Sequence, residues 1–228
     1  YSTPGQKKYY VVNNVLETFT SKVGQFVEIM NLEEFGNALF IDHEIQVAEK
    51  DEKIYSGNFF KSSFDLSKKN NNVAIIGGGD GGVARECLEN NTNYIDWYEL
   101  DPEIVESCYR HLPKVCSKVK KSNNVNTFWG DAFESIKSVE DSKYDKIFVD
   151  LNDDQYCIDL ARKNMKGLQR ILKQGGVITA QVGSKDKKPR QVENWCKVLK
   201  KSFGNVTVSG VYIPSFDCNW NFASSIMK

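Results

Sequence analysis

Histidine is scarce in this sequence, and its scarcity removes several kinds of site from consideration. The 228 residues include only two histidines, His43 and His111, which argues against a histidine-based metal centre or catalytic triad. The six cysteines form no Cys-x-x-Cys pair and show no metal-ligand spacing. We therefore expect no bound metal, and we interpret the cysteines as small core residues of a protein in a reducing, cytoplasmic compartment.

An excess of charge of one sign is also absent. The 30 Lys and Arg residues balance 30 Asp and Glu residues, so the composition favours neither nucleic acid nor a membrane surface as a partner. We interpret the short basic segments at residues 68–69 and 185–190 as solvated loops. No apolar run is long enough to cross a bilayer. The length suits one large domain, or one of ordinary size with a small one.

Glycine, by contrast, is concentrated in one segment. Residues 77–82 read Gly-Gly-Gly-Asp-Gly-Gly and directly follow an apolar run at 73–76, which predicts a buried strand, a turn and the start of a helix. The spacing of Gly77, Gly79 and Gly82 fits the nucleotide-binding fingerprint, in which glycines let a ligand approach the backbone. Glu99 ends the next strand-like run, at the distance expected for a residue that binds ribose hydroxyls.

Asp80 lies inside this glycine loop and narrows the choice of ligand. A dinucleotide would place its pyrophosphate on the turn and on the end of the following helix, where a carboxylate would repel it. The same carboxylate would attract an amine or a sulfonium. The sequence therefore favours a cationic nucleoside, such as S-adenosylmethionine or its decarboxylated form, over NAD. A glycine turn that binds no ligand is the weaker alternative.

The pattern of the chain predicts two parts. Residues 1–68 contain short β-branched and aromatic runs, which predict a small β-rich N-terminal domain. In residues 69–228, strand-like and helix-like segments alternate, which predicts an α/β domain with a mainly parallel sheet and helices on both faces. We interpret this second part as a Rossmann-like, seven-stranded domain of the class I methyltransferase type. The polar segment at 67–72 marks the boundary.

The expected elements can be given by residue number. In the first part, we expect strands at 9–15, 25–30, 37–41 and 45–48, then a short helix capped by Asp51. In the second part, we expect strands at 73–76, 95–99, 125–128, 146–150, 177–181, 206–212 and 221–227. The expected helices span 82–90, 102–112, 132–139, 159–172 and 191–203. Asp101 would cap the second of these, and Gly175-Gly176 would close the fourth.

Ligands of such sheets bind where the parallel strands end, and the polar residues at those ends are mostly acidic. They are Asp80 after the first strand, Glu99 and Asp101 after the second, Asp131 after the third, Asp150, Asp153 and Asp154 after the fourth, and Gln181 after the fifth. Such a rim suits a positively charged substrate.

An amine is mostly protonated at neutral pH and becomes a nucleophile only after it loses a proton. A carboxylate can first pair with the ammonium and then accept that proton. We expect Asp150, which directly ends an apolar strand, to be this base. We expect Asp153 to hold the same or a neighbouring nitrogen, and we interpret Asp154 as a loop or cap residue.

Several ordered segments resemble the polyamine aminopropyltransferases, the family of spermidine, spermine and thermospermine synthases. The resemblance runs from about residue 21 to the C-terminus. It rests on residues 35–42, 45–52, 55, 76–82, 98–101, 130–132, 150–153, 180–183 and 213–216.

The resemblance implies that decarboxylated S-adenosylmethionine is the co-substrate and that no cofactor is permanently bound. Its aminopropyl group would pass to an amine by direct displacement, releasing methylthioadenosine. The implied base is Asp150. The implied donor contacts are Gln25, Gln46, Gly77, Gly79, Asp80, Gly82, Glu99, Asp131 and Ala132, with Asp80 on the donor's amino group, Glu99 on the ribose, and Asp131 and Ala132 on the adenine. The implied acceptor contacts are Tyr55, Asp153, Gln181 and Trp220, and the N-terminal domain would support a homodimer.

Two details favour spermidine as the acceptor, giving spermine or thermospermine. Trp220 lies six residues after Pro214, one fewer than spermidine synthases typically have, and Leu151 stands where they have serine. Three alternatives stay open. They are a spermidine synthase acting on putrescine, a putrescine N-methyltransferase-like enzyme using S-adenosylmethionine, and a non-catalytic polyamine-binding relative. Asp80 argues against the methyltransferase, whose donor carries a carboxylate.

The chain also departs from the family pattern at two places. Ser56-Gly57 stands where the family usually has His or Gln followed by Glu. The stretch from Asp154 to the next helix is shorter than usual, and in the family this stretch closes over the site. We therefore expect a pocket that is more open or that admits a different amine.

Overall fold

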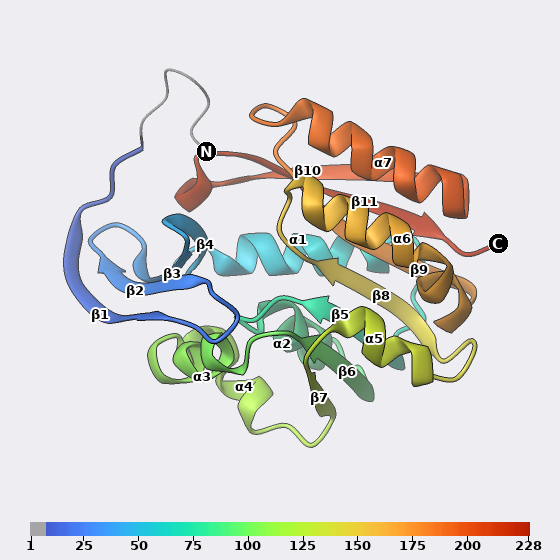
Figure 1. Ribbon diagram of the computed structural model, residues 1–228, viewed down its shortest axis with the longest axis horizontal. Coiled ribbons are helices and arrows are strands. Elements are labelled where there is room, and N and C mark those ends of the chain that lie inside the picture. The colour runs from blue at the N-terminus through green and yellow to red at the C-terminus, as the bar shows by residue number, and fades with distance from the viewer. Residues whose placement is uncertain (1–7) are drawn as a thin grey trace.

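The computed structural model describes residues 8–228, and its first sheet has four antiparallel strands. They lie in the order β1-β2-β3-β4 (Figure 1). Their bounds are β1 Val12–Thr20, β2 Phe26–Leu32, β3 Gly36–Ile41 and β4 Glu44–Ala48. Asp42 and His43 form the predicted turn between the last two strands, and both have a positive φ.

The second sheet has seven strands in the order β10-β11-β9-β8-β5-β6-β7. Strands β7, β6, β5, β8 and β9 are parallel, and β11 runs antiparallel to both of its neighbours. This confirms the predicted Rossmann-like fold of the class I methyltransferase type. The bounds are β5 Asn72–Gly77, β6 Tyr94–Glu99, β7 Val125–Trp129, β8 Tyr144–Asp150, β9 Leu172–Gly183, β10 Thr207–Ile213 and β11 Cys218–Ile226.

Helices cover both faces of this sheet (Figure 1). Their bounds are α1 Glu52–Phe64, α2 Gly82–Glu89, α3 Pro102–His111, α4 Pro113–Lys120, α5 Ala132–Ser135, α6 Gln155–Ile171 and α7 Pro189–Phe203, with short 3₁₀ turns η1 Ile136–Ser138 and η2 Pro214–Phe216. Among residues 8–228, none of these helices has both the length and the apolar character needed to span a membrane.

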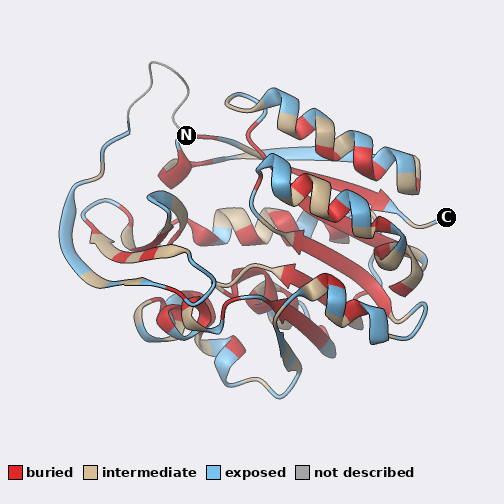
Figure 2. Cartoon of the chain, viewed as in Figure 1, coloured by how far each residue is buried: buried red, intermediate tan, exposed pale blue. Residues whose placement is uncertain are grey.

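The alternation of side chains in β5 shows how the two faces are filled. Ala74 and Ile76 pack with the apolar sides of α6 and α7, whereas Val73 and Ile75 pack with α1 and α2. Both faces of the central strands are therefore buried, as Figure 2 shows for the seven-stranded sheet. A parallel sheet covered on both sides is rigid at its strand ends, and this rigidity positions the site.

The small sheet packs beside the carboxyl ends of the parallel strands (Figure 1). Val27, Ile29 and Leu39 of its inner face join a buried cluster with residues of α3 and α4. Ile45 of β4 packs against the cluster that includes Phe216 and Trp220. The N-terminal sheet therefore forms one wall next to the edge at which ligands of this fold bind.

The helix predictions need four corrections. Helix α4 was not predicted, because Pro113 and the lysines of this segment hide a one-sided apolar pattern. The helix predicted at 132–139 divides into α5 and η1. Gly175-Gly176 does not close a helix, since α6 ends at Ile171 and both glycines lie inside β9. Asp51 stands at the start of α1 without a side-chain cap, because its carboxylate accepts the Ser215 N–H at 2.6 Å.

The division into residues 1–68 and 69–228 remains a proposal. Helix α1 lies on the N-terminal side of that division and packs against β9, β10 and β11 of the second sheet. It carries Tyr55 toward the end of β8.

Candidate active site

The glycine loop presses directly against the end of β8. Gly77 and Gly78 have φ values of 79° and 71°, and the Gly78 N–H donates to the Asp150 carbonyl at 3.1 Å. A Cβ atom on Gly78 would lie 2.8 Å from Asp150 Oδ2. The loop therefore needs glycine both for its backbone angles and for this close approach. We call this loop and Glu99 the donor side of the site.

Two carboxylates converge on the start of α2. The side chain of Asp80 accepts the Gly82 N–H at 2.6 Å, and a Cβ on Gly82 would lie 2.6 Å from Glu52 Oε1. Glu52 is 3% exposed, and its other oxygen accepts from the buried Arg85 guanidinium at 2.5 Å. Glu52 Oε1 itself is buried and has no hydrogen-bond partner. A buried carboxylate oxygen without a donor is unfavourable, and a cationic donor bound at this point would satisfy it.

Asp80 titrates far from its usual range. Burial, followed by the charges of Asp150 and Glu52, raises the pKa of Asp80 to about 8. Within residues 8–228, no lysine, arginine or histidine forms a salt bridge with Asp80. A cationic ligand beside Asp80 would lower this pKa and favour the charged carboxylate.

Glu99 lies beside the glycine loop, at the end of β6. One of its oxygens accepts the Asp101 N–H at 3.0 Å, and the other lies 3.4 Å from a Cβ placed on Gly79. Burial raises the pKa of Glu99 to about 7. Asp101 caps α3, as predicted, because its Oδ1 accepts the Glu103 N–H at 2.9 Å, whereas its Oδ2 is buried without a hydrogen-bond partner.

The remaining predicted donor contacts are Asp131, Ala132, Gln25 and Gln46. Asp131 is exposed and caps α5 by accepting the Phe133 N–H at 2.8 Å, and Ala132 is the first residue of that helix. Gln25 lies in the turn before β2, and the Gln46 amide donates to the Glu44 carbonyl of its own strand. Within residues 8–228, neither glutamine makes a hydrogen bond to the glycine loop. Asp80 and Glu99 thus lie within or against the glycine loop, and Gly130, which precedes Asp131, donates its N–H to the Glu99 carbonyl at 2.9 Å.

Asp150 is the centre of what we call the acceptor side. It ends β8, and its Oδ1 accepts a hydrogen bond of 2.6 Å from the hydroxyl of Tyr55, a residue of α1. Burial raises the pKa of Asp150 to about 6, although the Tyr55 hydrogen bond acts in the opposite direction. Burial and the Asp150 charge also raise the pKa of Tyr55 well above its usual value, so Tyr55 remains a donor. A carboxylate with a pKa of about 6 suits a general base at neutral pH.

Gln181 and Trp220 form one connected group next to Asp150. The Trp220 indole N–H donates to Gln181 Oε1 at 3.1 Å, and the Gln181 amide donates to the Leu151 carbonyl. The Tyr55 ring lies 6.5 Å from Trp220 and 6.1 Å from Phe216. Aromatic rings arranged around a carboxylate can contact both the methylene chain and the ammonium of an amine.

Asp153 and Asp154 have different surroundings. Asp154 caps α6 by accepting the Cys157 N–H at 2.7 Å, which is one of its two interpretations, loop or cap, although α6 begins at Gln155 and not at the predicted residue 159. Asp153 is 8% exposed, and its Oδ1 pairs with the Lys188 ammonium at 3.2 Å. The interpretation of residues 185–190 as a solvated loop is therefore wrong in part. Lys187 also points inward and donates to the Phe216 carbonyl at 2.8 Å.

Sequence reasoning missed two residues of this site. Glu52 precedes Tyr55 by three positions on α1, so helical spacing alone places both on one face and could have identified it. No comparable signal marks Lys188, because its pairing with Asp153 joins positions 35 residues apart across two loops.

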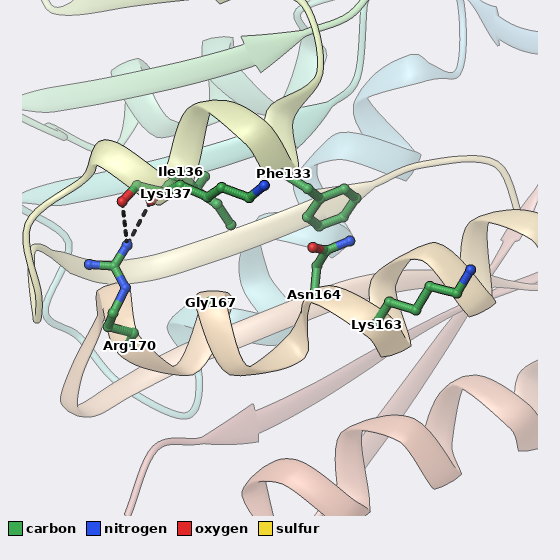
Figure 3. A pocket seen from close by; sticks show the side chains of 7 residues that line it. All are labelled: Phe133, Ile136, Lys137, Lys163, Asn164, Gly167 and Arg170. Carbon is green, nitrogen blue, oxygen red and sulfur yellow. Dashed lines mark hydrogen bonds between the residues drawn. The ribbon is translucent and has the colours of Figure 1, made fainter.

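A separate hollow lies away from these residues, between α5 with η1 and α6 (Figure 3). It has a volume of about 260 Å³, and Lys137, Lys163 and Arg170 lie along it. The Arg170 guanidinium donates to the Ile136 carbonyl at 2.7 Å and to Asp141, while Lys137 pairs with Glu134. Arg170 and Lys137 thus bond to neighbouring residues of the fold. None of the predicted site residues lines the hollow.

Fold and site together define a class of protein. A Rossmann-like sheet carries a glycine loop with buried carboxylates, and the strand next to it ends on a half-buried carboxylate of raised pKa. A glycine loop at the carboxyl end of a parallel strand is typical of domains that bind nucleotides or nucleosides. Comparisons with known proteins narrow the class further. The family model "Spermine/spermidine synthase domain" matches residues 52–228, and "Spermidine synthase tetramerisation domain" matches residues 1–49.

Individual relatives agree with these matches. A polyamine aminopropyltransferase of Prochlorococcus marinus (strain NATL2A) is 31% identical over 88% of this chain and 72% of its own length. One from Korarchaeum cryptofilum is 29% identical over 98% of this chain and 70% of its own length. The chain belongs to the spermine/spermidine synthase family. Both relatives described above are polyamine aminopropyltransferases.

Solved structures agree at the level of the fold. A spermidine synthase in complex with the transition-state analogue AdoDATO matches 100% of this chain and 79% of its own length, with a TM-score of 0.93 and 19% identity. The spermidine synthase from Thermotoga maritima matches with a TM-score of 0.91 and 19% identity.

Proposed function

We propose that this chain transfers the aminopropyl group of decarboxylated S-adenosylmethionine to a polyamine and releases methylthioadenosine. The observation that carries the proposal is the position of Asp150. This half-buried carboxylate is hydrogen-bonded to Tyr55 at 2.6 Å and borders a glycine loop that contains Asp80. A base and a cation-binding carboxylate on either side of one loop are what this transfer requires.

The donor side would hold the nucleoside. Glu99, beside Gly79, would accept hydrogen bonds from the ribose hydroxyls. Asp131 and Ala132, at the start of α5, would contact the adenine. Asp80 would pair with the donor's amino group, and Gln25 and Gln46 would line the rim of the donor site from the small sheet. The absence of a carboxylate on the decarboxylated donor removes the repulsion that Asp80 would impose on S-adenosylmethionine.

The chemical step would be a direct displacement at carbon. The acceptor nitrogen attacks the aminopropyl carbon bonded to the sulfonium sulfur, and the carbon–sulfur bond breaks. Its electron pair stays on sulfur, so that methylthioadenosine leaves as a neutral thioether. Asp150 accepts the proton that the acceptor ammonium must lose, while Asp153 and Tyr55 hold the acceptor in line. Because the sulfonium is already a good leaving group, orientation and deprotonation supply the catalysis.

We propose spermidine as the acceptor. The short connection from Pro214 to Trp220 supports this, since η2 is followed after one residue by β11. The aromatic group of Tyr55, Phe216 and Trp220 offers a wall for the methylene chain of a long amine. Putrescine is the second candidate, favoured by the spermidine synthases among the structures of similar fold.

We also propose that the protein is a cytoplasmic homo-oligomer. The six cysteines are free thiols, in keeping with a reducing compartment. The N-terminal sheet exposes Val12 and Val15 of β1, and the family model that matches this segment is named for tetramerisation. The homodimer expected from the sequence would be the smallest such assembly, and light scattering would measure its mass.

A product assay by mass spectrometry tests the function. The purified protein would receive either decarboxylated S-adenosylmethionine or S-adenosylmethionine, each with putrescine, spermidine or no amine. We expect a gain of one aminopropyl group on spermidine together with methylthioadenosine. The same gain on putrescine alone would identify a spermidine synthase, and transfer only from S-adenosylmethionine would identify a methyltransferase. No product from any pair would favour the non-catalytic relative.

A further inference from the structure

Among residues 8–228, Lys188 is the one cation that forms an ion pair with a residue that the sequence predicted for the site, namely Asp153. The ammonium of Lys188 lies 3.2 Å from Asp153 Oδ1, and the two side chains are 27% and 11% exposed. The second oxygen, Asp153 Oδ2, is buried and has no hydrogen-bond partner. The internal ammonium therefore pairs with Oδ1 alone, and Oδ2, which lies against the backbone of Gly183, stays without a donor.

The backbone on both sides of this pair is held in place. The Lys188 N–H donates to the Ser184 carbonyl at 2.7 Å, which closes a tight turn between β9 and α7. Lys187, one residue earlier, anchors this turn to η2 through the Phe216 carbonyl. On the other side, a Cβ at Gly183 would lie 2.5 Å from Asp153 Oδ2, so only glycine leaves space for this carboxylate. The turn at 184–188 therefore directs Lys188 at Asp153.

We propose that Lys188 determines acceptor specificity, because its ammonium occupies the position on Asp153 that an acceptor ammonium takes. This inference rests on the proposed function, in which Asp153 binds the acceptor. Lys188 and a polyamine offer the same chemical group, a primary ammonium on a short methylene chain. The acceptor then gains its contact with Asp153 only by displacing Lys188.

The short stretch after Asp153 makes this role possible. Only Asp154 separates Asp153 from the start of α6 at Gln155, so that stretch has no length with which to cover the acceptor side. The turn at 184–188 approaches the same place from the end of β9, and it brings a positive charge with it. A lysine in this position favours amines whose other contacts with the site compensate for the free energy lost when the Lys188–Asp153 pair is broken. Multiply charged amines that also contact Asp150 and the aromatic wall meet this condition, and a monoamine does not.

Steady-state kinetics of Lys188→Met and Lys188→Arg test this role. Methionine keeps the length of the side chain and removes the charge, so we expect the KM for the acceptor to fall about three- to tenfold with kcat within about twofold. Arginine keeps the charge, and we expect a KM close to that of the wild type. Lys185→Met is the matched control, since Lys185 is exposed in the same turn, and its KM should not change. An unchanged or raised acceptor KM in Lys188→Met would overturn the inference.

Two further measurements separate this role from a structural one and from the proposed function. In an Asp153→Asn background, Lys188→Met should leave the acceptor KM unchanged, because the carboxylate for which the two ammonium groups compete is gone. If the wild type makes no product with any amine, the proposed function fails, and calorimetric titration of spermidine with methylthioadenosine present decides the inference. Tighter binding to Lys188→Met would support it, and equal or weaker binding would overturn it.

Discussion

The donor and acceptor sides satisfy their carboxylates in different ways. On the donor side, Asp80 and Glu99 accept hydrogen bonds from backbone N–H groups, and burial raises the pKa of each. On the acceptor side, Asp150 accepts from Tyr55, and Asp153 pairs with Lys188. The donor side therefore lacks a cation that its ligand would supply, whereas the acceptor side already contains partners that a ligand would have to replace or share.

This difference has a consequence for stability. Holding a carboxylate in a dry place without a counter-ion costs free energy, which the folded chain limits by keeping the proton on the carboxylate. Without a cationic ligand, the donor side therefore lowers the stability of the folded chain. The acceptor side is partly compensated without ligand, because Tyr55 donates to Asp150 and Lys188 pairs with Asp153, so we expect its residues to affect affinity and rate more than stability. Variants on the two sides of the site test this contrast.

Asp150→Asn should have the largest effect. Asparagine keeps the shape and can still accept from Tyr55, but it cannot take a proton from the amine. We expect kcat to fall by about 10²–10⁴-fold, the usual contribution of a positioned base. Calorimetry should show that the donor product methylthioadenosine still binds. Asp154→Asn is the matched control, because asparagine caps a helix as well as aspartate, and it should stay within about twofold of the wild type. Turnover of Asp150→Asn at the wild-type rate would exclude Asp150 as the base.

Asp80→Asn should weaken donor binding and stabilise the free protein. Loss of the carboxylate removes the ion pair with the donor's amino group, so we expect the donor Kd to rise about 30-fold or more, which is roughly 2 kcal/mol. Calorimetric titration with decarboxylated S-adenosylmethionine measures it. An unchanged Kd would show that Asp80 does not face the donor.

The stability change of this variant should depend on pH. The folded-state pKa of Asp80 is raised to about 8, so the folded chain binds more protons than the unfolded chain between about pH 4 and pH 8. The wild type therefore loses stability as pH rises through this window, and Asp80→Asn does not lose this contribution. We expect the Tm of the variant to exceed that of the wild type by roughly 2–4 °C or more at pH 8, and by less at pH 5. Asp65→Asn, at an exposed position, should show no such difference.

Tyr55→Phe should shift the pH profile of the reaction. The Tyr55 hydroxyl stabilises ionised Asp150 and so opposes the effect of burial on its pKa, which stands at about 6. Without the hydroxyl the pKa of Asp150 rises, and the ionised base forms only at higher pH. We expect the acid limb of the kcat profile to move up by roughly one pH unit. A profile that keeps its position would mean that Asp150 does not limit the rate on that limb.

Trp220→Phe should have the smallest effect. Phenylalanine keeps an aromatic ring beside Tyr55 but loses the indole N–H that donates to Gln181. Loss of one hydrogen bond of roughly 1 kcal/mol corresponds to an increase of about two- to fivefold in the acceptor KM. The donor KM serves as the internal comparison and should not change. An equal rise in both would indicate a general disturbance of the site.

The sequence reasoning succeeded where local patterns decide the outcome. The apolar runs and the glycine loop predicted β5, the turn and the start of α2, because strand ends, glycine turns and helix starts follow from neighbouring residues. The caps at Asp101 and Asp154 were predicted for the same reason. It failed where a neighbour in space changes the outcome, as at Asp51, whose carboxylate binds Ser215 instead of capping α1.

The class of fold, the donor loop with its acidic rim, and Asp150 as the candidate base were thus predictable from the amino-acid sequence. These features follow from the alternation of strands and helices and from the residues at the strand ends. Three pairings could be seen only once the chain was folded: Glu52 with Asp80 at Gly82, Tyr55 with Asp150, and Lys188 with Asp153. The partners are 28, 95 and 35 positions apart in the sequence, and the packing of helices and loops around the sheet brings them together.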